Sequence, residues 1–225
     1  MGQRRSFRHG WRSLLFIIAV ALIGSTLLKS FVFQAFYVPS GSMKNTFQIS
    51  DRFIASRLGH EIQHGDIVVF YDSAGWMAED ENAIALRKSS LTRFLKMSGI
   101  VPSENNEVMV KRVIGLPGDE VACCTAYNQI KVNGIGIYEP YLPSGTLPSD
   151  VTFSVVVPEG SLFLMGDNRA HSADSRRFLN HPSGGFVRQA DVIGRAVATI
   201  WPLSRATVHH RPAETFMEAE SPAGR

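Results

Sequence analysis

VMVKRVIGLPGD, residues 108–119, is a run of β-formers that ends in a Pro-Gly turn. Branched apolar residues favour strands, and Pro and Gly interrupt them. Alternation along such a strand predicts that Lys111 and Arg112 point to opposite faces. Comparable short runs, separated by Gly, Pro and Asn-Gly, occur at 67–71, 129–132, 153–157, 162–165 and 192–201. This spacing predicts a mainly β fold, built of antiparallel β-sheet in a barrel-like domain.

Charge is concentrated at the N-terminal end of the chain. Residues 1–50 hold six basic residues and no acidic one, so the rest of the chain holds 17 basic and 20 acidic residues. The net charge of +3 therefore does not describe a basic domain, which argues against nucleic acid as a partner.

An apolar run follows the first arginines, from Leu14 to Leu28. Continued as far as residue 37 it is long enough to cross a bilayer, and we expect a transmembrane anchor over 13–37. Because the arginines precede it, the positive-inside rule makes 1–12 a cytoplasmic basic tail of a single-pass membrane protein with its later residues outside the cell membrane. The alternative is a cleavable secretory signal, but no small-x-small site follows the run.

Three other stretches of the chain carry weaker signals. Residues 78–97 are rich in helix-forming residues, and their role is not readable from the sequence. Residues 206–225 lack periodicity, and we expect a flexible tail. The only two cysteines, Cys123 and Cys124, are adjacent. Two small buried side chains are the simplest interpretation, and a disulfide between the neighbours is the alternative.

The candidate chemistry is that of an activated serine. Ser42 lies in Pro39-Ser40-Gly41-Ser42-Met43, just after the apolar run, and a serine hydroxyl needs a base within reach. No Gly-x-Ser-x-Gly elbow supports a histidine triad, and no spaced ligand set predicts a metal. Lys111, flanked by apolar residues, is the better base, because removal from water lowers the pKa of a lysine.

A third motif reads Gly166-Asp167-Asn168-Arg169 and runs on to Ser172-Ala173-Asp174-Ser175-Arg176. The three motifs, in this order after an anchor, resemble type I signal peptidase, a membrane-bound serine protease that removes signal peptides from exported proteins. The resemblance runs from the anchor to about Pro202, and the single anchor is typical of Gram-positive-type members. It implies a catalytic domain over 38–205, with an accessory β region at about 120–162.

The resemblance also implies roles for individual residues. Ser42 would be the acyl-enzyme nucleophile and Lys111 the general base. Ser40 would contribute its hydroxyl to the oxyanion hole, and Ser172 would hold the lysine amine. Asp174 and Arg176 match a pair that braces the site, and Asp167 is expected to pair with Arg112. The positions that line the substrate pockets in the family are occupied by Phe36, Val38, Pro39, Met109 and Val110.

The chain departs from the family pattern at two places. The usual Met-x-Pro-Thr is Met43-Lys44-Asn45-Thr46, and the usual Asp-Asn after the third box is Ala170-His171. Neither change removes a catalytic group, but both bear on the fine geometry.

The expected partners are preprotein signal peptides with Ala-x-Ala-like cleavage sites, and membrane lipid; no metal or cofactor is expected. Two other classes remain open. A self-cleaving Ser-Lys repressor would carry a DNA-binding helix pair instead of an anchor. A non-enzymatic membrane-anchored β module would bind without cutting and would survive loss of Ser42.

Overall fold

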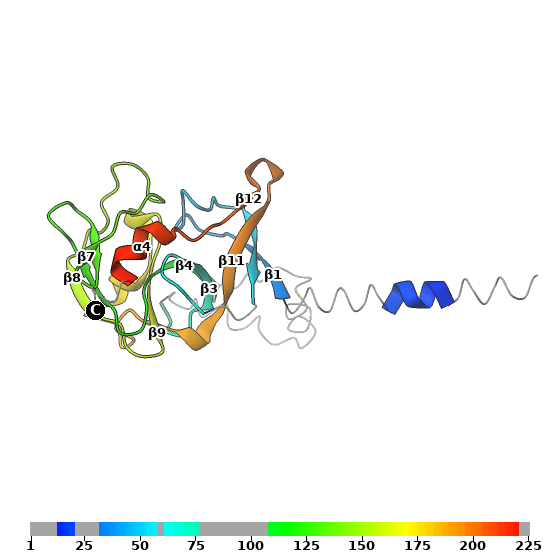
Figure 1. Ribbon diagram of the computed structural model, residues 1–225, viewed down its shortest axis with the longest axis horizontal. Coiled ribbons are helices and arrows are strands. Elements are labelled where there is room, and N and C mark those ends of the chain that lie inside the picture. Colours follow the sequence, from blue (N-terminus) through cyan, green and yellow to red (C-terminus); the bar gives the residue numbers. More distant parts are fainter. Residues whose placement is uncertain (1–12, 21–31, 58–60, 77–107, 221–225) are drawn as a thin grey trace, which may run out of the picture.

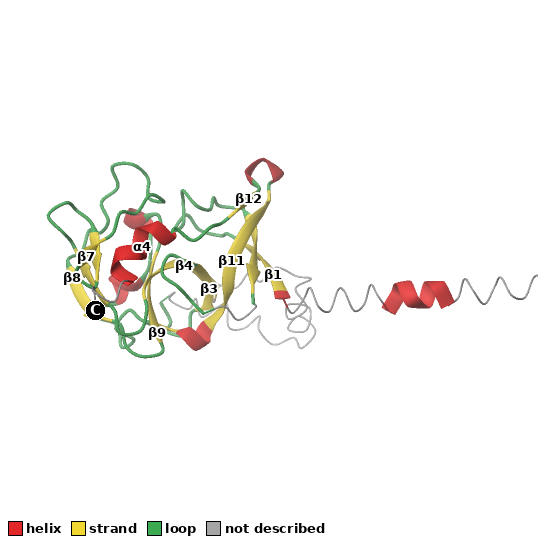
Figure 2. Cartoon of the chain, in the orientation of Figure 1, coloured by secondary structure: helices red, strands yellow, loops and turns green. Residues whose placement is uncertain are grey.

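The computed structural model describes residues 13–20, 32–57, 61–76 and 108–220. These residues form two antiparallel β-sheets with few helices, which confirms the mainly β prediction (Figures 1 and 2). The range 78–97, whose role the sequence left open, lies outside the described residues.

The larger sheet has eight strands. Its order is β1 (Phe33–Tyr37), β2 (Arg52–Ser56), β11 (Val192–Trp201), β3 (Ile67–Tyr71), β4 (Val108–Gly115), β9 (Ser161–Met165) and β10 (Val187–Arg188), and β12 (Thr207–Val208) pairs with β11. Every pairing is antiparallel. β4, which carries the sequence around Lys111, is therefore an interior strand between β3 and β9.

The smaller sheet has the order β7 (Ile135–Gly136), β6 (Ile130–Val132), β5 (Glu120–Cys123) and β8 (Phe153–Val156). It is inserted between β4 and β9 and lies within the range 120–162, where an accessory region was expected. Short 3-10 turns and a C-terminal helix complete the part of the fold after β1: η2 (Arg169–His171), η3 (Ser175–Phe178), η4 (Gln189–Asp191), η5 (Leu203–Arg205) and α4 (Ala213–Glu220).

The core consists of three apolar clusters that match the sheet faces. One cluster joins β1, β2 and the turn after β1, through Phe36, Phe53 and Phe47 among others. A second covers another face of β3 and β4, and a third joins the accessory sheet to β9 and α4. Each Å² of apolar surface buried in these clusters stabilises the fold by about 25 cal/mol. Because the third cluster contains residues of both sheets, its burial holds the two sheets together.

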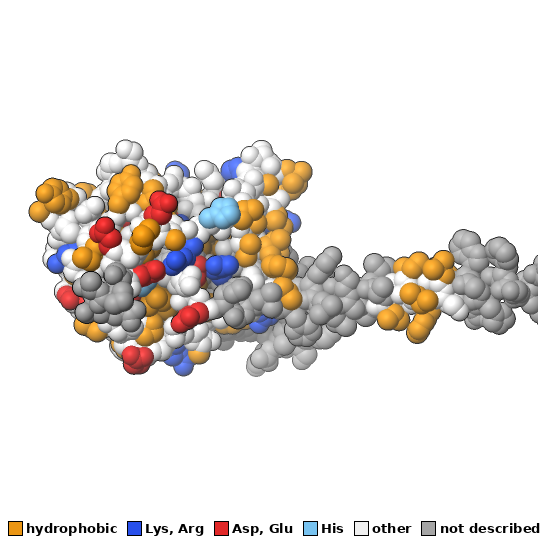
Figure 3. Space-filling view, in the orientation of Figure 1, with side chains coloured by type: hydrophobic (Ala, Val, Ile, Leu, Met, Phe, Trp, Pro, Cys, Tyr) orange, Lys and Arg blue, Asp and Glu red, His pale blue; other side chains and the backbone are white. Residues whose placement is uncertain are grey.

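The predicted anchor is wrong at its C-terminal end. Residues 33–37 form β1, in register with β2 from Phe33 opposite Ser56 to Tyr37 opposite Arg52. Phe36 is buried while its neighbours in β1 are exposed or half-buried, so this part alternates as a strand does. Residues 13–20 are helical, and their mostly hydrophobic side chains are exposed (Figure 3). Within the described ranges, none of the helices has both the length and the apolarity that crossing a membrane requires.

The prediction of a flexible tail is wrong for residues 207–220. These residues form β12 and α4, and α4 buries Phe216 and Ala219 completely or almost so. Phe216 stacks on His64 with ring centroids 5.3 Å apart. Pro212 immediately precedes the first residue of α4, where a proline costs no helical hydrogen bond.

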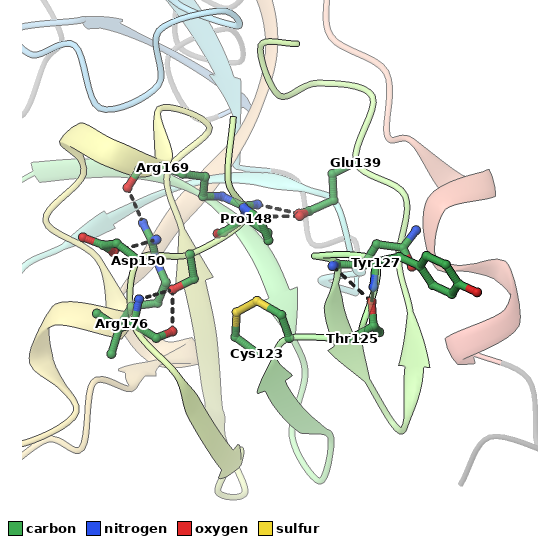
Figure 4. The surroundings of a disulfide bond; sticks show 12 residues. Cys123, Thr125, Tyr127, Glu139, Pro148, Asp150, Arg169 and Arg176 are labelled. Carbon is green, nitrogen blue, oxygen red and sulfur yellow. Dashed lines mark hydrogen bonds and ion pairs between the residues drawn. A yellow bond between two sulfur atoms is a disulfide. The ribbon is translucent and has the colours of Figure 1, made fainter. Parts of the chain in front are cut away.

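The two cysteines form a disulfide, as the alternative interpretation proposed (Figure 4). Cys123 is the last residue of β5 and belongs to the cluster between the accessory sheet and α4. Beside it the chain turns through Thr125, whose hydroxyl accepts from the Tyr127 N–H at 3.2 Å. The pair therefore lies in the accessory sheet.

Candidate active site

The turn after β1 presents Ser42. Its backbone is closed by hydrogen bonds from Lys44 N to Gly41 O (3.0 Å) and from Phe47 N to Met43 O (2.8 Å). The Met43 and Phe47 side chains are fully buried, so they fix the turn to the core while Ser42 remains at its edge. Ser42 itself is 7% exposed.

Lys111 reaches this serine from β4. Its Nζ donates to the Ser42 Oγ at 2.8 Å, and its side chain is 3% exposed. Burial lowers the pKa of Lys111 to about 8, against an opposing effect of the Asp174 and Asp167 carboxylates. A large neutral fraction near pH 8 gives Ser42 a base in hydrogen-bond contact.

The end of β9 makes room for this contact. β4 and β9 pair until Arg112 opposite Met165, and beyond Met165 the chain turns away at Gly166. A Cβ at Gly166 would lie 2.5 Å from the Ser42 carbonyl oxygen and 2.2 Å from the Ser172 Oγ. Only glycine fits here, because the nucleophile turn packs directly on this backbone.

Asn168 holds the same turn, a role that its place in the third motif alone does not indicate. Its backbone N–H donates to the Ser42 carbonyl at 3.0 Å, and its Nδ2 donates to the Gly41 carbonyl at 2.9 Å. These two bonds fix the peptide groups on either side of the Ser42 Cα, including the one that carries the Ser42 N–H.

Arg112 pairs with Asp167 as the sequence predicted. Its Nε and Nη2 donate to the two carboxylate oxygens at 2.8 and 2.6 Å, a two-pronged contact between buried groups. Burial opposes the charge of Arg112, but Asp167 raises the pKa of the guanidinium above its usual value. Thr46 also donates to Asp167, so the acid joins β4 to the nucleophile turn.

Asp174 and Arg176 form the second expected pair. Arg176 Nη2 and Nε donate to Asp174 at 2.9 and 3.0 Å, and Asp174 also accepts from the Gly166 N–H at 3.0 Å. Burial raises the pKa of Asp174, but the bonds from Arg176 outweigh it and the net pKa is lowered. The pair therefore supports the backbone beneath Ser42.

Ser172 does not make the contact expected of it. Its Oγ is buried and, within the part of the chain that the structure covers, meets no partner at hydrogen-bond geometry. It lies close enough to Asp174 to help lower the pKa of that carboxyl. The lysine amine contacts the Ser42 Oγ instead.

Ser40 and the expected pocket residues are divided between surfaces. The Ser40 hydroxyl donates to the Ser42 Oγ at 3.3 Å from an exposed position. Phe36, Val38 and Val110 pack in one cluster at the base of the turn, while Met109 packs in the cluster of the other strand face and Pro39 is exposed. Alternation along β4 separates Met109 from Val110.

A polar network beside the site was missed from the sequence. Arg169, 1% exposed, donates to Glu139 and to the Pro148 carbonyl (Figure 4). The Tyr141 hydroxyl donates to Glu139 at 2.6 Å, and the Tyr141 ring lies 3.9 Å from the Arg112 guanidinium carbon. A buried arginine is not predictable from a motif, because only the fold supplies its partner.

No group of three or more His, Cys, Asp or Glu residues arranged to hold a metal ion is found among the residues that the structure describes.

Comparison with known proteins assigns the chain to a class and then to a family. Residues 10–201 match the model of a peptidase family, so the protein is a hydrolase of the peptidase class. The chain belongs to the signal peptidase family, peptidase S26. The members of this family that it resembles are signal peptidases I, serine peptidases that act on the signal peptides of preproteins.

Three relatives and one solved structure illustrate the similarity. The chain is 34% identical to the probable signal peptidase I of Mycobacterium leprae, over 84% of this chain and 76% of that protein. It is 31% identical to the signal peptidase I of Mycobacterium tuberculosis (90% and 76% covered) and 29% identical to that of Bacillus caldolyticus (90% and 94%). A signal peptidase I structure from Enterococcus faecalis aligns with a TM-score of 0.38 at 26% identity, over 60% of this chain and 97% of that one.

Proposed function

We propose that this protein cleaves signal peptides from exported preproteins by a Ser-Lys dyad mechanism through an acyl-enzyme. The observation that carries the proposal is the 2.8 Å contact between Lys111 Nζ and Ser42 Oγ in a buried setting where the lysine pKa is about 8. A neutral amine at this distance accepts the hydroxyl proton as the nucleophile attacks.

The reaction proceeds in two halves. The Ser42 Oγ attacks the scissile carbonyl carbon while its proton moves to Lys111 Nζ. The oxyanion is stabilised by the Ser42 N–H and the Ser40 hydroxyl, which turns from the Ser42 Oγ to the new charge. Lys111 returns the proton to the leaving amine, and the acyl-enzyme remains. Lys111 then takes a proton from water, which attacks the ester carbonyl carbon. As the acyl C–O bond breaks, Lys111 returns this proton to the Ser42 Oγ, which restores the free serine and the neutral lysine.

The substrate binds as an extended strand beside Val108–Val110, with small side chains toward the surface around Phe36, Val38 and Val110. Met109 lies on the other face of β4 and supports the strand from behind. Residues 13–32 anchor the chain in the cell membrane with 1–12 on the cytoplasmic side, which leaves the β body on the extracytoplasmic face. The support is the apolar run and its basic flank.

The test is cleavage of a secreted precursor that carries an Ala-x-Ala site. The full chain in mild detergent is compared with Ser42→Ala, Lys111→Ala and, as a matched lysine control, Lys131→Ala in the accessory sheet. Cleavage after the small-x-small site is expected in the wild type and the control and is lost in the other two. Near-normal cleavage by Lys111→Ala would rule out the lysine base. Cleavage with Ser42→Ala would rule out the nucleophile.

A further inference from the structure

Asn45 lies in the nucleophile turn at a backbone φ of +101°. Proline is confined to φ near −65°, so this backbone excludes the proline that the related motif carries, whereas asparagine tolerates positive φ. The Asn45 side chain is also engaged: its Nδ2 donates to the Tyr141 carbonyl at 2.6 Å. The turn that carries Ser42 is thereby bonded directly to the accessory region, 96 residues further along the chain.

Tyr141 is well placed to receive this bond because its other groups are already fixed. Its hydroxyl donates to Glu139, which in turn is paired with the buried Arg169. Its ring lies over the guanidinium of Arg112 at 3.9 Å, a distance at which the cation and the ring attract. Tyr141 is therefore held in place by its hydroxyl and its ring, and its carbonyl is a fixed acceptor for the Asn45 amide.

A second set of contacts links the Ser42 turn to Tyr141 through Arg112 and Asp167. Arg112, under the Tyr141 ring, pairs with Asp167. Asp167 in turn accepts from Thr46, and its N–H approaches the Met43 sulfur at 3.4 Å. Met43 and Thr46 thus contact Asp167, and Asn45, which lies between them in the chain, contacts Tyr141.

We infer that Asn45 is a positioning residue, which locks the Ser42 turn onto Tyr141 and keeps the serine at hydrogen-bond distance from Lys111. This inference rests on the proposed function. The Asn45 amide bonds to the Tyr141 carbonyl and acts on Ser42 only through the turn, so we expect its loss to change the rate of the chemical step. The surface around Phe36, Val38 and Val110 is untouched, and substrate affinity is retained.

The sharpest variant is Asn45→Asp, which keeps the size and the tolerance for positive φ but replaces the amide donor by an acceptor facing a carbonyl. Asn45→Gly keeps the backbone conformation and removes the side chain. Asn128→Asp is the matched control, because Asn128 also has positive φ (+56°) but lies in an exposed turn of the accessory sheet.

Two measurements are made on the full chain in detergent: kcat and KM for the Ala-x-Ala precursor, and amide hydrogen exchange. We expect kcat to fall about tenfold in Asn45→Gly and about 100-fold in Asn45→Asp, since a lost bond and an unmatched acceptor both displace the turn. KM stays within about twofold and Asn128→Asp resembles the wild type. The amides of Thr46 and Phe47, which bond to the Met43 carbonyl, exchange faster in the Asn45 variants.

The inference is overturned if kcat and exchange in Asn45→Asp match the wild type, if the change is confined to KM, or if Asn128→Asp loses as much activity. Exchange also separates this inference from the proposed function. Should the wild type cut no precursor, the proposed function fails. Faster exchange at Thr46 and Phe47 in Asn45→Asp would then still establish the tie to Tyr141, and unchanged exchange would reject it.

Discussion

The Lys111 ammonium nitrogen lies 2.8 Å from the Ser42 hydroxyl oxygen, and both side chains are buried. Lys111 has Arg112 as its chain neighbour, but the charge of the arginine is matched by Asp167 at 2.6 Å. The charge of Arg112 is therefore balanced by Asp167, and the arginine stays protonated. Lys111 is buried away from water, which lowers its pKa and makes its proton easier to lose.

The pH dependence of cleavage follows from this arrangement. The active form has neutral Lys111, whose pKa is lowered to about 8, so kcat/KM should fall about tenfold per pH unit below that value and level off above it. A pH series of kcat/KM from 5 to 10 checks this. Activity that stays flat down to about pH 5 would contradict a lysine base.

Stability should respond to the same group. Between pH 8 and 10.5 the unfolded chain binds the Lys111 proton and the folded chain does not, so the free energy of unfolding rises with pH across this window. Below pH 8 Lys111 is protonated in the folded state as well, and its buried charge destabilises the fold by about 3 kcal/mol, at about 1.4 kcal/mol per unit by which its pKa is lowered. Lys111→Met should therefore be more stable than the wild type at pH 7, with a difference that narrows toward pH 10.5. Denaturant unfolding at both pH values measures it, and a constant difference would count against the lowered pKa.

Gly166→Ala should disable the enzyme without unfolding it. The added Cβ meets the Ser42 carbonyl and must push the turn away from Lys111, and a displacement of this kind costs about 100-fold in kcat. Gly145→Ala, at an exposed turn with φ +76° and open space around the new Cβ, is the control and should cost only about 1 kcal/mol of stability. Equal activity in the two variants would show that the turn relaxes freely.

The C-terminal helix should contribute to stability. Phe216 is fully buried between the accessory sheet and His64, so Phe216→Ala should lower the free energy of unfolding by about 3–5 kcal/mol. Met217, 62% exposed on the same helix, provides the control, and Met217→Ala should change it by less than about 0.5 kcal/mol. Thermal melts of both variants give the comparison, and a small loss in Phe216→Ala would mean that α4 is only loosely docked.

Much of the fold was predictable because local pattern and tertiary structure agree. The runs at 67–71, 108–114 and 192–201 became β3, β4 and β11 almost residue for residue. Branched apolar residues bounded by Gly and Pro leave little choice of conformation. The two-pronged pair of Arg112 and Asp167 was also expected, on resemblance alone.

The errors have physical causes. β1 continues an apolar run, so only its pairing with β2 separates it from the predicted anchor. α4 has two buried residues in a polar segment, a pattern too short to detect by periodicity. The bond from Asn45 to Tyr141 and the burial of Arg169 depend on contacts between distant parts of the chain, which no local pattern encodes.

The place of the accessory sheet bears on the entropic cost of joining β4 to β9. β4 and β9 are neighbours, yet residues 116–160 separate them, and closing so long a loop is entropically costly. The two ends of the insert are bonded to each other: Glu120 pairs with Val156, and Val157 N donates to Asp119 O at 2.8 Å. With β5 and β8 paired in this way, only a few residues lie between the end of β4 and the insert, and between the insert and the start of β9. In entropic terms, the paired base of the insert shortens the connection between β4 and β9 to a few residues, which lowers the cost of holding the Gly166 turn beside Lys111.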